Sequence, residues 1–210
     1  MSTPSLSRRV ARRVPVQDRS ERRVASLLSH AEAVMARVGY EATTMTEIAA
    51  RAKASIGSVY QYFPNKEAIS AALYSKYGAQ LVERWTMLQT ETEGLGSEGL
   101  ASAIIDKFFS FASEQPAFFP ILSAPMTVRK DPAVKERLRG QFAELFMAHN
   151  GALSREDAMQ VAAVTLQTIR SLINLCGEVR AKDRPRIVAE HKVLLAAYLE
   201  RRISPQAAHR

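Results

Sequence analysis

The chain has 210 residues, of which 47% are hydrophobic, and its formal net charge is +8 at pH 7. This composition is typical of a globular protein with one or two domains and excludes a disordered chain. No apolar run approaches the roughly 18 residues of a transmembrane helix, so no membrane span is expected. A cytoplasmic location is expected, because no apolar segment follows the basic N-terminus and the single cysteine, Cys176, cannot form an internal disulfide.

The positive charge is concentrated at the N-terminus. Residues 1–23 hold seven arginines against one aspartate and one glutamate, a local charge of +5 that leaves +3 for the rest of the chain. We expect residues 1–19 to form a basic arm. It could be a solvated, disordered tail, or it could contact a polyanion such as nucleic acid or an acidic membrane surface. The candidate contact residues in the arm are Arg8, Arg9, Arg12 and Arg13.

The segment after the arm has the spacing of amphipathic helices. Apolar residues in VASLLSHAEAVMARV recur at i, i+3, i+4 and i+7, which predicts a helix with Ser20 as its N-cap and Gly39 as its stop. Thr44 and Glu47 then form a capping-box pattern, in which each side chain satisfies an amide of the other's residue. This pattern predicts a short helix that ends near residue 52.

A second short helix follows at once. Ser55 is expected to cap a helix of barely two turns, and Asn65 to cap a much longer helix running from Lys66 to about residue 89. A helix so short would normally be mostly apolar if it only filled the core, and this one is not.

The remaining chain also reads as helices, separated by glycine and proline. Helices are expected near 98–114, 116–123, 131–149, 154–179 and 184–202. No stretch alternates convincingly with a period of two, so the fold class is predicted to be all-α. We expect a helix-turn-helix domain at 20–66 and a second helical domain at 67–210.

The short helix in SIGSVYQYFPNKEA has two different faces. At about 100° per residue, Val59 and Phe63 share one side, while the opposite side carries small and polar residues. With the capped helix before it, this segment predicts a helix-turn-helix whose second helix enters a DNA major groove. Gly57 and Ser58 would allow close approach to base edges, and tyrosine hydroxyls could donate to phosphates.

The amino-acid sequence of this segment identifies a protein family more specifically than its helical periodicity does. VGYEATTMTEIAARAKASIGSVYQYFPNKEAI resembles the N-terminal domain of the tetracycline-repressor (TetR) family of transcriptional regulators, over about residues 22–75. The resemblance implies an all-helical homodimer with a three-helix DNA-binding head. It also implies a larger C-terminal domain that binds an effector and dimerises through its last two long helices, near 154–179 and 184–202.

The resemblance also assigns residues by position. It implies phosphate contacts from Thr44, Tyr60, Tyr62 and Lys66. It implies groove-facing positions for Ile56, Gly57, Ser58 and Gln61, with the capping Ser55 counted among the DNA-binding candidates.

Two positions depart from the family pattern. Lys53 stands where relatives commonly have glycine, so it must either adopt a left-handed conformation, at a cost of roughly 1 kcal/mol, or turn another way. Ile56 is apolar where many relatives are polar. It could contact a thymine methyl group or simply pack.

The C-terminal half is rich in aromatic residues, most of them in DKFFSFASEQPAFFPIL. Such residues could line an apolar effector pocket, or they could form an ordinary aromatic core. The pocket candidates are Trp85, Phe108, Phe109, Phe111, Phe118, Phe119, Met126, Phe142 and Phe146. An effector of apolar or aromatic character is therefore expected.

Other functional classes have little support. GLGSEG matches a dinucleotide-binding pattern literally, but it follows the end of a helix and not a strand. The four histidines are scattered, so no enzyme activity, metal site or cofactor is expected. We predict a ligand-responsive repressor that binds a palindromic operator, with an activator or a ligand-independent repressor as alternatives.

Overall fold

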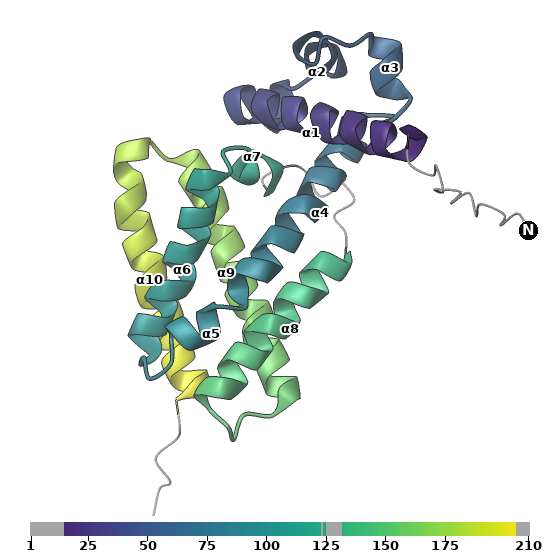
Figure 1. Cartoon of the computed structure of the whole chain (residues 1–210). Coiled ribbons are helices and arrows are strands. Elements are labelled where there is room, and N and C mark those ends of the chain that lie inside the picture. The colour runs from purple at the N-terminus through teal and green to yellow at the C-terminus, as the bar shows by residue number, and fades with distance from the viewer. Residues whose placement is uncertain (1–14, 123, 125–131, 205–210) are drawn as a thin grey trace, which may run out of the picture.

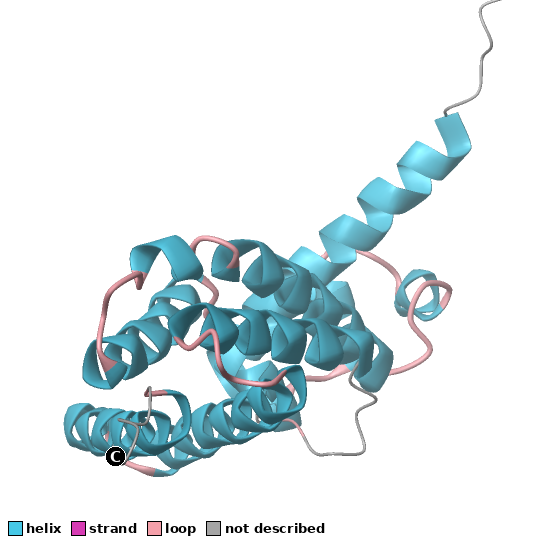
Figure 2. Cartoon of the chain, turned by 90° about the horizontal axis from the view of Figure 1, so that it is seen from below, coloured by secondary structure: helices cyan, strands magenta, loops and turns pink. Residues whose placement is uncertain are grey.

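The computed structural model describes residues 15–122, 124 and 132–204. Within these residues the only regular secondary structure is helix, with no strand (Figure 2), which confirms the all-α fold class. No helix of the described part is long and apolar enough to cross a membrane.

Three helices at the N-terminal end form a small head (Figure 1). They are α1 (Pro15–Ala42), α2 (Met45–Arg51) and α3 (Ile56–Tyr60). Gly39 has φ 80° and ψ 170°, so the regular part of α1 stops there as expected. The start of α1 differs from the prediction: the helix begins at Pro15, so Ser20 lies inside it and residues 15–19 are not part of a free arm. Arg8, Arg9, Arg12 and Arg13 lie outside the described residues.

A larger helical body follows the head. Its elements are α4 (Lys66–Trp85), α5 (Leu88–Glu91), α6 (Ser97–Glu114), α7 (Phe118–Leu122), α8 (Pro132–His149), α9 (Arg155–Glu178), the 3-10 turn η1 (Ala181–Asp183) and α10 (Arg184–Ile203). Helix α4 runs from the head into the body, where it packs against α7 and α8. Helix α10 packs on α6 and α9, and α8 packs on α9.

The long helix expected to reach residue 89 ends earlier, at Trp85. The carbonyl oxygen of Val82 accepts hydrogen bonds from the Thr86 hydroxyl at 3.2 Å and from the Gln141 side-chain amide at 2.8 Å. Two side-chain donors thus occupy the acceptor that the next helical amide would use. A separate short helix, α5, then begins at Leu88.

One glycine sets the spacing between α4 and α8. A Cβ atom added to Gly78 would lie 2.1 Å from Cγ1 of Val134, a buried residue of α8. Glycine in the middle of a helix normally costs up to about 1 kcal/mol relative to alanine. Its presence here is explained by the close approach of the two helices.

Gly78→Ala is therefore expected to destabilise the protein even though alanine is the better helix former. Overpacking of this kind costs about 1–3 kcal/mol, part of which the helix propensity offsets. We expect a net loss of about 1 kcal/mol in urea unfolding. The double variant Gly78→Ala, Val134→Ala removes both Cγ atoms and leaves only the Cβ of residue 134, at 3.1 Å, so Gly78→Ala should cost less in the Val134→Ala background than in the parent. A Gly78→Ala protein more stable than the parent would contradict this account.

Candidate DNA-binding interface and ligand cavities

The short helix α3 is anchored by two apolar residues and capped by a serine. Val59 is fully buried and Phe63 is 7% exposed, so both dock on the rest of the head. The Ser58 amide donates to the Ser55 hydroxyl at 3.2 Å, which confirms the predicted cap. This anchoring leaves the other side of α3 free to meet a ligand.

That other side is exposed. Ile56 is 40% exposed and Tyr60 51% exposed, while Gly57 and Gln61 are also exposed and Ser58 is half-buried. This exposure leaves the Ile56 side chain accessible on the same face, where contact with a thymine methyl group stays a prediction.

The turn before α3 is closed by Lys53 in the left-handed conformation, with φ 49°. The Lys53 amide donates to the Ala50 carbonyl at 3.1 Å and the Ala54 amide to the Ala49 carbonyl at 3.0 Å. This is the Schellman pattern, in which glycine is usual at the position of Lys53. Of the two geometries considered for Lys53, the chain adopts the left-handed one. Lys53 and the nearby Arg51 are both exposed, and neither forms an ion pair with a described residue.

The capping box at the start of α2 is only half formed. The Glu47 amide donates to the Thr44 hydroxyl at 3.2 Å, as predicted. The Glu47 carboxylate pairs instead with Arg37 of α1. A tertiary ion pair thus replaces the expected local bond and ties α2 to α1.

Lys66, expected to hold a phosphate, is already engaged within the head. Its ammonium donates to the carbonyl oxygens of Tyr40 at 2.9 Å and Glu41 at 3.0 Å, and it lies 4.4 Å from the centre of the Tyr40 ring. Because an ammonium has three N–H groups, one remains for a phosphate. Lys66 therefore joins the end of α1 to the start of α4, a role that the sequence did not indicate.

Tyr40 reinforces the same connection. Its hydroxyl donates to Glu67 at 3.3 Å. Burial, followed by the Glu67 carboxylate, raises the pKa of Tyr40 to about 12, so the hydroxyl keeps its proton and its donor role.

A further link joins α1 to the middle of α4. Glu32 accepts hydrogen bonds from the Tyr77 hydroxyl at 2.6 Å and from the Lys76 ammonium at 2.8 Å. Burial and this hydrogen bond raise the pKa of Tyr77 above its ordinary value. The head is thus fixed to α4 at two levels, and movement of α4 must move the head.

The body contains a small, partly open space, the core cavity, of about 100 Å³. Helices α4, α6, α7, α8 and α9 surround it, and most of its wall is apolar. Its wall residues include Tyr74, Tyr77, Gly78, Leu81, Phe108, Phe118, Val134, Leu138, Leu166 and Ile169.

The predicted pocket residues are distributed over several sites. Of the nine aromatic and methionine candidates, only Phe108 and Phe118 line the core cavity. Trp85 and Phe142 pack on each other with ring centroids 4.6 Å apart, away from that cavity. Phe109, Phe111, Phe119 and Phe146 do not line it either, and Met126 lies outside the described residues.

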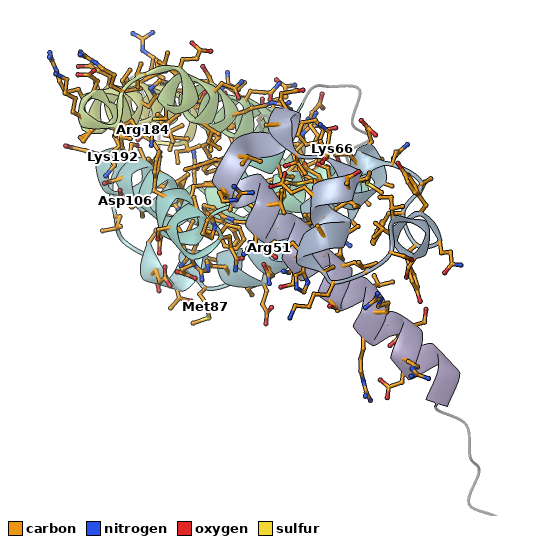
Figure 3. The ribbon with its side chains drawn as sticks, turned by 90° about the horizontal axis from the view of Figure 1, so that it is seen from above. Arg51, Lys66, Met87, Asp106, Arg184 and Lys192 are labelled. Carbon is orange, nitrogen blue, oxygen red and sulfur yellow. The ribbon has the colours of Figure 1, made fainter. Side chains whose placement is uncertain are left out.

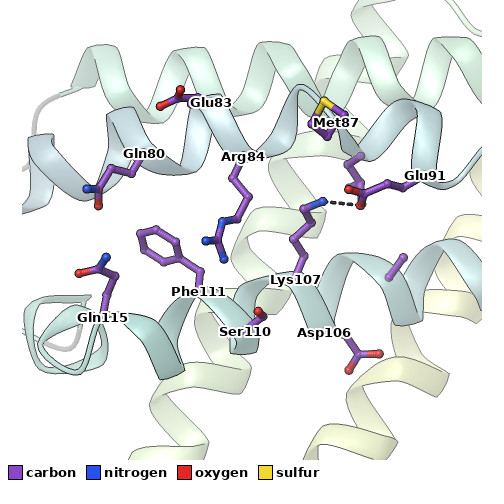
Figure 4. A pocket seen from close by; sticks show the side chains of 12 residues that line it. Gln80, Glu83, Arg84, Met87, Glu91, Asp106, Lys107, Ser110, Phe111 and Gln115 are labelled. Atoms are coloured by element: carbon purple, nitrogen blue, oxygen red, sulfur yellow. Dashed lines mark hydrogen bonds and ion pairs between the residues drawn. The ribbon is translucent and has the colours of Figure 1, made fainter.

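Phe111 instead contributes to an open groove between α4–α5 and α6, of about 930 Å³ (Figure 4). Two ion pairs lie at this groove: Arg84 donates to Glu114 at 2.9 Å and Lys107 pairs with Glu91, whereas Glu83 also lines the groove and pairs with no described residue. The hydrogen bonds from Arg84 hold the pKa of Glu114 below its ordinary value. Internal pairing leaves this groove without a free charge of either sign from these four side chains.

A capped, two-faced helix on a three-helix head, joined by one helix to a larger helical body with a cavity, defines a helix-turn-helix DNA-binding regulator with a ligand-binding domain. Residues 27–73 match the family described as bacterial regulatory proteins of the tetR family, and residues 98–199 match the tetracyclin repressor-like C-terminal domain. The chain belongs to the TetR family of transcriptional regulators. Membership identifies it as a non-enzymatic regulator, in agreement with the sequence-based expectation.

Several solved structures have the same fold. A TetR-family regulator from Streptomyces coelicolor is 27% identical, with a TM-score of 0.65 over 86% of this chain and 99% of that one. One from Pectobacterium atrosepticum is 20% identical, with a TM-score of 0.68 over 91% and 99%. The regulator FadR from Bacillus subtilis, solved in complex with stearoyl-CoA, is 19% identical, with a TM-score of 0.61 over 86% and 97%. No curated protein sequence matches the chain significantly.

Proposed function

We propose that this chain is a repressor that binds a palindromic operator as a homodimer and is released by a small apolar or aromatic effector in the core cavity. The observation that carries the proposal is the course of α4. Its first turn holds the end of α1 through Lys66, and its middle part, from Tyr74 to Leu81, lines the core cavity. A change in the cavity can therefore reach the head through one helix.

On the DNA side, the exposed face of α3 would meet base edges. Ile56, Gly57 and Gln61 are the exposed residues available for this, with Ser58 beside them. Thr44, Tyr60 and Tyr62 would bind phosphates. Two copies of α3, one from each protomer, would enter major grooves about one helical turn or somewhat more apart.

Dimerisation would use α9 and α10. Both helices expose large apolar side chains: Val164 is 45% exposed, Val193 66% and Leu194 57%. A second copy of the same two helices would cover these side chains and complete a four-helix interface. This arrangement would fix the distance between the two heads.

The size of the core cavity supports release by an effector. At about 100 Å³ it is smaller than the roughly 150 Å³ of a cavity that accepts benzene. Any larger molecule must either displace a wall or extend through the open side, and α4 is one of the walls. A ligand that binds the expanded form better would shift the population toward it and change the head spacing. FadR from Bacillus subtilis, which has this fold, was solved in complex with stearoyl-CoA.

The test is to select operators from a random duplex pool and then screen apolar and aromatic compounds against the purified protein. We expect an inverted-repeat site and a compound that raises the melting temperature and weakens DNA binding together. Leu166→Trp, at the half-buried cavity wall, should still bind the operator but lose the response. If the strongest effector were a highly charged metabolite or a metal ion, the proposed effector class would be wrong.

A further inference from the structure

A second and larger cavity lies where the head meets the body. It measures about 870 Å³ and is here named the junction cavity. Its walls come from the last turn of α1 (residues 38–42), from α6 and α7, and from the adjoining ends of α9 and α10. It shares only Ile173 with the lining of the core cavity, so the two are different sites.

The body side of the junction cavity is apolar and aromatic. Phe109 and Phe119 form an edge-to-face pair with ring centroids 5.6 Å apart, and both side chains are only half-buried. Ile173, Cys176 and Val188 add further apolar surface. Phe108 and Phe118, their neighbours in sequence, are buried in the core. The exposed parts of Phe109 and Phe119 thus offer an apolar wall to a ligand.

The charges near this wall favour an anion. Asp106 is neutralised by Lys192, whose ammonium is 2.6 Å from its carboxylate (Figure 3). Arg184, an exposed residue, lines the cavity and pairs with no described acidic residue. Burial raises the pKa of the Cys176 thiol, and the positive charge of Arg184 opposes that shift. The remaining acidic wall residue, Glu41, lies across the cavity on α1.

We propose that the junction cavity binds a small apolar molecule with one anionic group, such as a carboxylate, and that its occupancy changes the affinity for DNA. The anion would pair with Arg184 and the apolar part would lie against Phe109 and Phe119. The binding half of this proposal is independent of the effector proposed for the core cavity.

The coupling to DNA follows from the α1 wall. Tyr40 and Glu41 line the junction cavity, and their carbonyl oxygens hold the Lys66 ammonium at the start of α4. A ligand that shifts the last turn of α1 changes its hydrogen bonds to Lys66, and with them the position of α1 relative to the start of α4, beside α3. The effect must be reciprocal, so DNA will change the ligand affinity by the same factor.

Binding is tested on the full-length protein with anilinonaphthalene sulfonate, an aromatic anion whose fluorescence rises in apolar sites. Decanoate and 1-decanol, which share a chain length and differ in charge, serve as competitors. We expect decanoate to displace the dye at least tenfold better than decanol. Arg184→Gln should weaken decanoate about tenfold and leave decanol unchanged. Arg186→Gln, an exposed arginine outside the cavity lining, is the matched control and should change neither.

A steric variant locates the site. Val188→Trp fills the junction cavity from α10 and should abolish decanoate binding, whereas Leu166→Trp, in the core cavity, should not. Gly177→Leu, whose added Cβ would meet nothing within 4 Å, offers a second filling variant should Val188→Trp fail to fold. If decanoate binding survived Arg184→Gln and a folded filling variant, or was lost only in Leu166→Trp, the site would be the core cavity. No displacement by millimolar decanoate would also overturn the proposal.

The effect of the bound ligand on DNA affinity is measured by fluorescence anisotropy, with a duplex selected from a random pool. Saturating decanoate is expected to change the DNA affinity at least threefold, and Arg184→Gln to require about tenfold more decanoate for the same change. Decanoate that binds at the junction cavity without changing DNA affinity would refute the coupling while leaving the binding site intact.

Discussion

Gly57→Glu is expected to reduce operator affinity about a hundredfold with no loss of stability. Gly57 lies on the exposed side of α3, and a Cβ atom there would meet nothing within 4 Å. The fold therefore accepts the side chain. A carboxylate on this face would instead lie against DNA phosphates and base edges, and such like-charge contacts cost several kcal/mol, or about a factor of ten for each 1.4 kcal/mol.

Gly140→Glu in α8 is the matched control. It introduces the same charge at another helical glycine with open space around it, far from α3 in the sequence. It should leave both DNA affinity and melting temperature close to those of the parent. Anisotropy titrations at several salt concentrations measure the difference. Equal losses in the two variants would mean that net charge, and not the placement of α3, determines the effect.

Local signals predicted the start of several helices correctly. Ser55 and Asn65 cap their helices through bonds to amides three residues ahead, at 3.2 and 2.8 Å. A cap needs only the residues of its own turn, so the sequence contains all the required information. Gly39 stops the regular part of α1 for the same local reason.

Two of the errors arose where a distant residue decides the outcome. Helix α4 ends at Trp85 because Gln141, 59 positions away from Val82, donates to the Val82 carbonyl. The Glu47 carboxylate pairs with Arg37 and does not form the capping-box bond to the Thr44 amide. Neither partner can be found from spacing within a turn. Such replacements of local bonds by tertiary ones are a general limit of pattern-based prediction.

The DNA-binding face of α3 could be predicted from the sequence much better than the ligand cavities. The faces of α3 follow from helical geometry within a few residues, so Val59 and Phe63 were assigned correctly to the buried side. The ligand cavities were not. Aromatic content identified the right region, but consecutive phenylalanines point to different neighbours, so Phe108 lines the core cavity and Phe109 the junction cavity.

The role of Lys66 is the point at which sequence and structure differ most. By position it should bind phosphate, yet two of its hydrogen bonds go to the end of α1 and its charge lies over the Tyr40 ring. Phosphate binding and the link between α1 and α4 can be separated by experiment, because only the link contributes to the stability of the folded protein without DNA. Lys53, exposed and without an ion pair among the described residues, provides the comparison.

Lys66→Met keeps the aliphatic stem and removes the ammonium. This change deletes two charged hydrogen bonds and exposes two carbonyl acceptors. It is therefore expected to lower the free energy of unfolding by about 2 kcal/mol. For a chain of this length that corresponds to a melting temperature about 4–8 °C lower. DNA affinity should fall as well, because the end of α1 is no longer tied to α4 beside α3. Lys53→Gln also removes a positive charge from the head, but it should lower only the DNA affinity and its salt dependence, with little change in melting temperature. If instead Lys66→Met melted within a degree of the parent and lowered the salt slope by about one per half-site, its ammonium would serve a phosphate and not the junction between α1 and α4.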